Sequence, residues 1–111
     1  MKLNKPRRVS EATIQAELYM QLRLIGIECY LEYPIKLGSC SMRADIAIAY
    51  SGVIVGLIEV KSRTSKRSPS KKTRQYNKYK EVGLPFIYCM CMEDVDSVIK
   101  WSRKLKESKC K

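Results

Sequence analysis

Residues 52–62 read GVIVGLIEVKS, and this stretch decides both the expected fold and the search for a functional site. Its nearly continuous run of apolar residues is typical of a buried strand. Glu59 interrupts the run, and Lys61 follows two positions later. Because side chains two positions apart lie on the same face of a strand, we expect the carboxylate and the ammonium to lie together. Two simpler interpretations remain: a cross-strand ion pair, or a strand that ends at Ile58 with both charges in water.

The residues on either side of this stretch predict a single α/β domain. A chain of 111 residues is long enough for one hydrophobic core and too short for two. Apolar periodicity and the Gly, Pro and Ser positions predict the element order αβββαβα. The predicted elements are a helix over 11–25, strands over 27–35, 42–50 and 53–60, a helix from 72 or 73 to 82, a strand over 86–92 and a helix over 93–106.

These elements imply a central mixed sheet flanked by helices. The last strand follows a helix, so the connection is expected to cross over the sheet and to give parallel pairing. Pro34 predicts that the strand over 27–35 lies at an edge. The domain is expected to span residues 10–106, with a basic N-terminal arm at 1–9 and a basic C-terminal tail at 107–111.

The charge balance restricts the partners of this chain. It carries 22 Lys and Arg against 11 Asp and Glu, which gives a net charge of +11 and a sequence pI of about 9.6. Such an excess favours a polyanionic partner, and nucleic acid is the first candidate. An anionic membrane is a weaker one, because no helix pairs a Lys-rich face with bulky aromatic residues. Without an 18-residue apolar run or a signal peptide, we expect a cytoplasmic protein of prokaryotic, phage or viral type with no membrane partner.

The chain has no histidine and five cysteines. The absence of histidine excludes imidazole bases, Cys-His nucleophiles and metal sites with imidazole ligands. The cysteine number is odd and no CxxC motif occurs, so we expect reduced and mostly packed thiols. The five positions are Cys29, Cys40, Cys89, Cys91 and Cys110.

Two carboxylates are predicted to meet at one end of a hairpin. The turn at Ser51-Gly52 folds Asp45 back to a position opposite the region around residues 58–59, which includes Glu59. Two like charges at that distance repel each other unless a cation binds between them. Mg²⁺ or Mn²⁺ is bound by one or two carboxylates together with water and carbonyl oxygens, so the Val60 carbonyl is a natural third ligand.

A third acid is expected from the first helix. The predicted apolar stripe of this helix contains Ile14, Leu18, Leu22 and Ile25. At 100° per residue Glu11 lies within the stripe, whereas Glu17 lies about 100° from its centre. We therefore expect Glu11 to face the metal end of the sheet. The alternative is that Glu11 only complements the helix dipole.

Asp45, followed fourteen residues later by Glu59-Val60-Lys61 on a hairpin after a Glu-bearing helix, resembles the PD-(D/E)XK nuclease superfamily. The resemblance covers residues 10 to about 92, with Ala44 where proline is common. It implies a restriction-endonuclease-like αβββαβ core, acids that bind Mg²⁺ or Mn²⁺, and a lysine that acts on the attacking water. The chain is most similar to small stand-alone members of the VRR-NUC or junction-resolvase type.

The segment after residue 61 extends this resemblance. Gln75 and Tyr79 form a Q-x-x-x-Y pattern on one helix face, and related branches of the superfamily use such a Gln at the site and on DNA. The alternative is a solvated Gln with a packed Tyr. The remaining basic residues near the predicted metal site are expected to bind phosphates. The predicted nucleic-acid contacts are Arg43, Arg63, Lys66, Arg67, Lys71, Lys72, Arg74 and Tyr79.

Together these features predict a metal-dependent deoxyribonuclease, in which Glu11, Asp45, Glu59, Lys61 and Gln75 are the catalytic candidates. A structure-selective endonuclease acting on junctions, flaps or branched DNA is the expected form. The alternative is a nucleic-acid-binding module that retains the fold without catalysis. Cutting both strands needs two sites, so we expect a homodimer. Its interface is expected to use Tyr30, Leu31 and Tyr33 of the edge strand.

Overall fold

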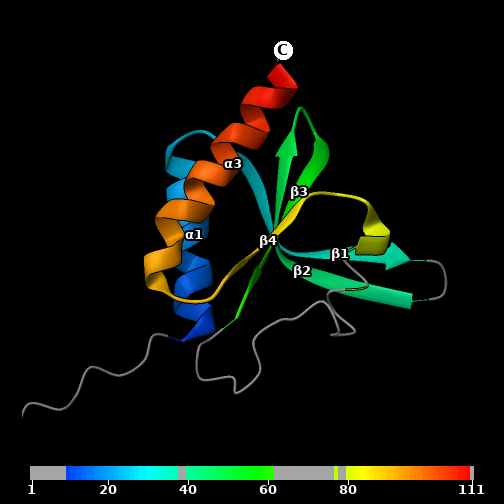
Figure 1. Cartoon of the computed structure of the whole chain (residues 1–111), viewed down its shortest axis with the longest axis horizontal. Coiled ribbons are helices and arrows are strands. Elements are labelled where there is room, and N and C mark those ends of the chain that lie inside the picture. Colours follow the sequence, from blue (N-terminus) through cyan, green and yellow to red (C-terminus); the bar gives the residue numbers. More distant parts are fainter. Residues whose placement is uncertain (1–9, 38–39, 62–76, 78–79, 111) are drawn as a thin grey trace, which may run out of the picture.

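The chain folds around a four-stranded mixed sheet with the order β1-β2-β3-β4 (Figure 1). The structure, a computed structural model, describes residues 10–37, 40–61, 77 and 80–110. The elements are α1 (Glu11–Leu24), β1 (Glu28–Leu37), β2 (Cys40–Tyr50), β3 (Val53–Val60), β4 (Phe86–Cys89), the 3₁₀ turn η1 (Met92–Asp94) and α3 (Val95–Cys110). The α/β class is therefore confirmed.

The pairing of the strands agrees with the sequence prediction. β1, β2 and β3 form an antiparallel meander, and β4 joins β3 in parallel after helical residues at 77 and 80–82. β1 contains Pro34 and lies at an edge of the sheet, where a missing N–H costs no ladder bond. The crossover to a parallel strand expected before Phe86 is thus present.

Helices α1 and α3 lie side by side on one face of the sheet (Figure 1). Ser10 caps α1, since its side chain accepts a hydrogen bond from the backbone N–H of Thr13. The helices bury one apolar stripe each against β2 and β3. The main core contains Ile14, Leu18 and Leu22 of α1, Ile46 and Ile48 of β2, Ile58 and Val60 of β3, and Val95, Val98 and Ile99 of α3.

A smaller core covers the opposite face of the sheet. Ala44, Ala47 and Leu57 are its buried residues, and partly buried side chains from 82–86 pack against them. Helices on one face and the 80–86 segment on the other account for the continuous apolar character of β3, which is buried from Val55 to Val60. β3 is therefore the central buried strand of the fold.

A two-residue turn joins β2 to β3 and fixes the register of the pairs next to it. Ser51 and Gly52 both have positive φ, at 50° and 81°. This pair of left-handed residues is the type I′ arrangement that suits the twist of antiparallel strands. The turn pairs Tyr50 with Val53 and Ala49 with Ile54, and a register shift at Val55 then moves the pairing by one residue. This shift places Ile46 opposite Ile58.

Several predicted boundaries are wrong. Ile25 is exposed at the edge of the main core because α1 ends at Leu24 and the chain turns away there. β2 begins at Cys40 instead of residue 42, and β4 ends at Cys89 instead of residue 92. The predicted tail at 107–111 is largely helical, since α3 continues to Cys110. The run of Lys and Glu there is compatible with a helix, so polarity alone was no stop signal.

The sequence predicts reduced, mostly packed thiols and no membrane-spanning helix. Cys29 and Cys89 are free thiols, and burial raises the pKa of Cys29 to about 11 and that of Cys89 to about 12. The two buried thiols are thus protonated and unreactive at neutral pH. Over the described ranges, no helix has the length and apolar character needed to cross a membrane.

Candidate active site

The predicted carboxylate pair is present where β2 and β3 run together. Ile46 lies opposite Ile58 and Ala47 opposite Leu57, so the antiparallel register continues to Asp45 opposite Glu59. Asp45 Oδ2 accepts a hydrogen bond of 2.7 Å from the backbone N–H of Val60. This bond joins the end of β3 to the Asp45 side chain. The meeting of Asp45 and Glu59 is therefore confirmed.

Glu59 and Lys61 share one face of the chain, as their spacing predicted. Lys61 Nζ lies 3.6 Å from Glu59 Oε1. Glu59 is only 6% exposed, which is unusual for a carboxylate. Because β3 continues to Val60 and Glu59 is buried, the alternative of a strand that ends at Ile58 with both charges in water is wrong.

The electrostatics of Asp45 reflect this crowding. The pKa of Asp45 is raised from 3.8 to about 7, chiefly by burial. The Val60 N–H lowers this pKa, whereas the Glu59 and Glu32 carboxylates contribute to the increase. A carboxyl that titrates near neutral pH beside a second, buried carboxylate is typical of a functional site.

A third carboxylate, that of Glu32 on β1, lies opposite Asp45. Leu31 pairs with Ile46 and Tyr33 with Ala44, so Glu32 stands opposite Asp45 although the two are not themselves a ladder pair. Glu32 has a φ of 52°, a left-handed conformation inside a strand. The sequence analysis did not identify Glu32, because no glycine or asparagine marks the positive φ.

Gln15 connects α1 to Glu32 and Asp45. Its Nε2 donates a hydrogen bond of 3.1 Å to Glu32 Oε1 and one of 3.0 Å to the backbone carbonyl of Asp45. Gln15 was also missed by the sequence analysis, which searched the first helix for acids. One available signal was its spacing of four from Glu11, which places both residues on one helix face.

The other predicted site residues have different positions. Glu11 is exposed in the first turn of α1, one turn before Gln15, and its role stays a prediction. Glu17 accepts a hydrogen bond from Gln21 within the helix. Arg43 is exposed on β2, two positions from Asp45. The remaining predicted residues lie outside the described part of the chain: Arg63, Lys66, Arg67, Lys71, Lys72, Arg74, Gln75 and Tyr79.

The donor set at Asp45 and Glu59 fits one small divalent cation. Within the described ranges, no group of three or more acidic or cysteine side chains is arranged to hold a metal ion. Mg²⁺ needs fewer protein ligands, since one or two carboxylates suffice and water fills the rest. The pKa of Asp45 is raised by burial and by the nearby Glu59 carboxylate, so ionisation of Asp45 is unfavourable here without a cation. A cation between the two carboxylates would remove their repulsion.

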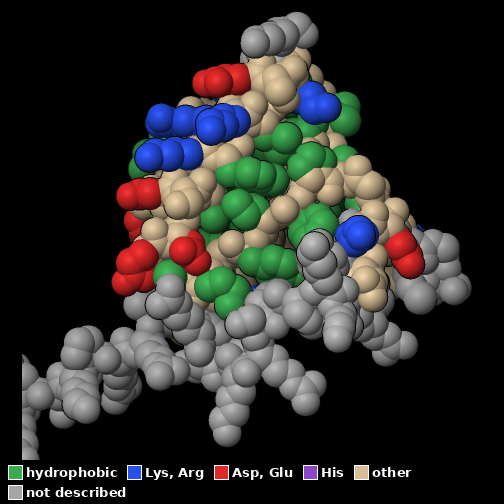
Figure 2. All heavy atoms as spheres, in the orientation of Figure 1, with side chains coloured by type: hydrophobic (Ala, Val, Ile, Leu, Met, Phe, Trp, Pro, Cys, Tyr) green, Lys and Arg blue, Asp and Glu red, His purple; other side chains and the backbone are tan. Residues whose placement is uncertain are grey.

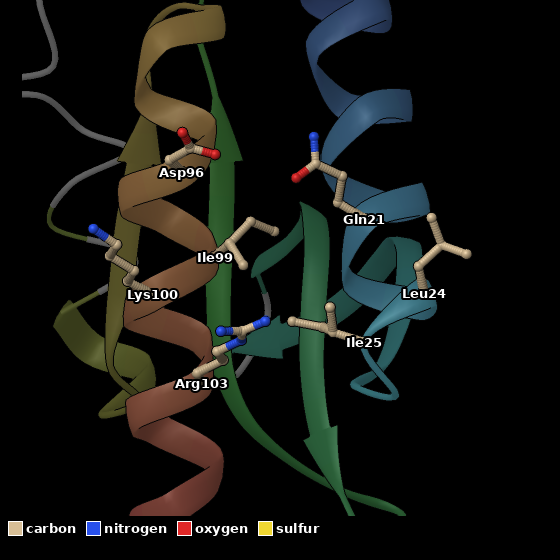
Figure 3. Close-up of a pocket in the computed structure, with 7 residues that line it drawn as sticks. All are labelled: Gln21, Leu24, Ile25, Asp96, Ile99, Lys100 and Arg103. Atoms are coloured by element: carbon tan, nitrogen blue, oxygen red, sulfur yellow. The ribbon is translucent and has the colours of Figure 1, made fainter.

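A hollow lies between α1 and α3, and the labelled side chains of both helices surround it (Figure 3). It has a volume of about 380 Å³, and its lining includes the apolar Leu24 and Ile25 and the basic Lys100 and Arg103. Lys and Arg side chains gather at the upper left of Figure 2, over α3. The lining of the hollow combines cations, apolar side chains and Asp96, so it favours no single class of ligand.

Comparison with known proteins provides no family assignment. No family model, no curated protein and no solved structure matches this chain. The functional argument therefore depends on the residues and geometry described above.

Proposed function

We propose that this chain is a metal-dependent nuclease that hydrolyses phosphodiester bonds in DNA. The observation that carries the proposal is the close approach of Asp45 to buried Glu59, with Lys61 Nζ 3.6 Å from the second carboxylate. Two carboxylates and one lysine at the ends of neighbouring strands are the groups that a metal-dependent phosphodiesterase needs. The net charge of +11 supports a polyanionic substrate.

Each residue has a separate role in this proposal. Asp45 and Glu59, with the Val60 carbonyl, would hold Mg²⁺ or Mn²⁺. The ion would polarise the phosphate and lower the pKa of a bound water. Lys61 would orient the attacking water or stabilise negative charge that develops on the phosphate. The Val60 N–H holds Asp45 in place through its hydrogen bond.

The resemblance to the PD-(D/E)XK superfamily supports the same proposal. The order of the described elements, with the acids on β2 and β3 and a crossover to parallel β4, is compatible with a restriction-endonuclease-like fold. In such a fold Glu11 and Gln75 would assist the site. Arg43, exposed beside Asp45, would bind a neighbouring phosphate. We also propose that the active form is a homodimer in the cytoplasm, which would bring two sites to one DNA.

Cleavage of defined DNA tests this function. Purified protein is incubated with labelled junction, flap, single-stranded and plain duplex DNA, in Mg²⁺ or Mn²⁺ and in EDTA. We expect metal-dependent cleavage of at least one substrate, a loss of 10²-fold or more in Asp45→Asn, and retained DNA binding by this variant. Asp96→Asn is the matched control, because it makes the same change at an exposed position of α3.

The alternative of a binding module gives a different result. DNA binding without cleavage of any substrate in either metal would contradict the nuclease and favour the module. Equal cleavage by wild type and Asp45→Asn would mean that the activity belongs to another site or to a contaminant.

A further inference from the structure

The β1–β2 ladder is interrupted beside the carboxylate pair. Glu32 adopts a left-handed conformation, and it is absent from the paired positions although both of its neighbours remain in register. Both strands change faces at this point. Ile46 and Ile48 belong to the main core, whereas Met42 and Ala44 contact the smaller core on the opposite face. Asp45 thus lies where regular strand pairing does not hold its backbone.

Gln15 supplies a hydrogen-bond donor at this interruption. One N–H of its amide donates to the Asp45 carbonyl at 3.0 Å, and the other donates to Glu32 Oε1 at 3.1 Å. A buried or half-buried carbonyl without a donor is costly, so the contact with Asp45 has a clear energetic reason. α1 itself is anchored by Ile14 and Leu18, which are almost fully buried on either side of Gln15 along the helix. The Gln15 side chain therefore extends from a part of α1 that is held in place by buried neighbours.

We propose that Gln15 is the positioning residue of the active site: its amide replaces the missing strand contact, fixes the backbone of Asp45, and thereby aims the Asp45 carboxylate at the Val60 N–H and at Glu59. The expected effect of Gln15 on catalysis rests on the proposed function. Its effect on the position of Asp45 does not. Groups that orient a metal ligand affect metal affinity strongly, by 10- to 100-fold in characterised sites. Small displacements of a catalytic group reduce rates by a similar factor.

Gln15→Met removes both donors while preserving side-chain length, neutral charge and good helix propensity. Gln21→Met makes the same change on the same helix, where the lost contact is an intrahelical hydrogen bond of 2.7 Å to Glu17. Gln15→Lys restores donors at a similar reach and serves as the rescue variant. It also provides a folded comparison if Gln15→Met does not fold.

Amide hydrogen exchange of the metal-free protein, measured by NMR, is the first readout. The Val60 N–H donates to Asp45 Oδ2, whereas the adjacent Lys61 N–H donates to the Cys89 carbonyl at 2.9 Å. We expect Gln15→Met to accelerate exchange at Val60 at least 10-fold relative to Lys61. Gln21→Met should leave this ratio unchanged, and Gln15→Lys should restore most of it. General fraying would accelerate both amides equally, which a positioning role does not predict.

The second readout is the Kd for Mn²⁺, measured by calorimetry on the same proteins. We expect Gln15→Met to raise it about 10-fold and Gln21→Met to change it less than 2-fold. An unchanged Val60 to Lys61 exchange ratio in Gln15→Met would overturn the inference. If wild type binds no Mn²⁺ but the exchange ratio changes as expected, the positioning role stands and the proposed function is contradicted.

Discussion

Lys61 Nζ lies 3.6 Å from Glu59 Oε1 at the end of β3. Asp45 of the neighbouring β2 contacts the same strand end through the Val60 N–H. The ammonium is partly exposed, whereas Glu59 is almost fully buried. When Asp45 is ionised, one cation lies near two carboxylates, and a net negative charge remains in this part of the sheet. This imbalance is the physical basis of the proposed metal site and of the first prediction.

The stability of the chain should fall as pH rises from about 4 to about 7. Asp45 has a raised pKa of about 7 when folded, so the folded chain holds a proton that the unfolded chain releases near pH 4. The stabilising contribution of the protonated carboxyl is complete below about pH 4 and is lost as pH rises through 7. We expect a loss of about 1–2 kcal/mol, less than the full shift implies because solvent screens a half-buried group.

Urea unfolding of wild type and Asp45→Asn between pH 4.5 and 8 measures this effect. The difference in the free energy of unfolding between the two proteins should change over that range and level off above pH 8. A constant difference would contradict the raised pKa. Mg²⁺ at millimolar concentration should reduce the pH dependence, because it binds the ionised carboxylates.

Replacing Ser51 by Asn should stabilise the hairpin. Ser51 has a φ of 50°, which Asn adopts more readily, and Asn-Gly is the preferred pair for this two-residue turn. We expect a gain of about 0.5 kcal/mol in the free energy of unfolding. Ser97→Asn, at an exposed position of α3, is the control and should give no gain. A loss of stability in Ser51→Asn would mean that the turn geometry differs from the one described.

Gly56→Ala should destabilise the contact between β3 and α3. A Cβ at Gly56 would overlap Leu105 Cδ2 and would lie 3.1 Å from Trp101 Cη2. Overpacking of this kind costs about 1–3 kcal/mol. Leu105→Ala in the same chain should recover part of that loss, which a double-mutant cycle by thermal or urea unfolding detects. Strictly additive effects of the two substitutions would show that the helix does not pack on Gly56.

The homodimer is expected to form through the β1 edge. Tyr30 and Leu31 are 42% and 43% exposed on this strand, which is one of the two edges of the sheet. An exposed apolar edge strand is a template for pairing with a second copy. Leu31→Lys should convert the dimer to a monomer in light scattering at micromolar protein. Val53→Lys is the control, since Val53 is 64% exposed on β3, which does not pair with β1. A wild-type monomer with and without DNA would contradict this prediction.

The site could be predicted from sequence where it depends on strand periodicity and one short turn. Period two placed Glu59 with Lys61, and Ser51-Gly52 placed Asp45 opposite the region around residues 58–59. The register shift beside Ala49, which selects Glu59 within that region, was not predicted. The parts that were missed depend on tertiary contacts. Nothing in the local sequence marks the left-handed Glu32, and a Gln in a helix carries no sign of the carbonyl it will contact.

The helix ends show the same limit. Apolar spacing included Ile25 in the buried stripe, but the helix ends one residue earlier and its last turn directs Ile25 outward. At the other end of the chain, polar residues after 106 resembled a tail, although Lys and Glu extend α3 to Cys110. Side-chain periodicity predicts which face is buried, but it locates the end of that face poorly.

Calorimetric titration of metal-free protein with Mn²⁺ tests the central claim most directly, because every proposed step requires a cation between Asp45 and Glu59. We expect one ion per chain, no detectable binding in Asp45→Asn or Glu59→Gln, and unchanged binding in Asp96→Asn. Wild-type protein that binds no ion, or that binds it equally after Asp45→Asn, would contradict the account.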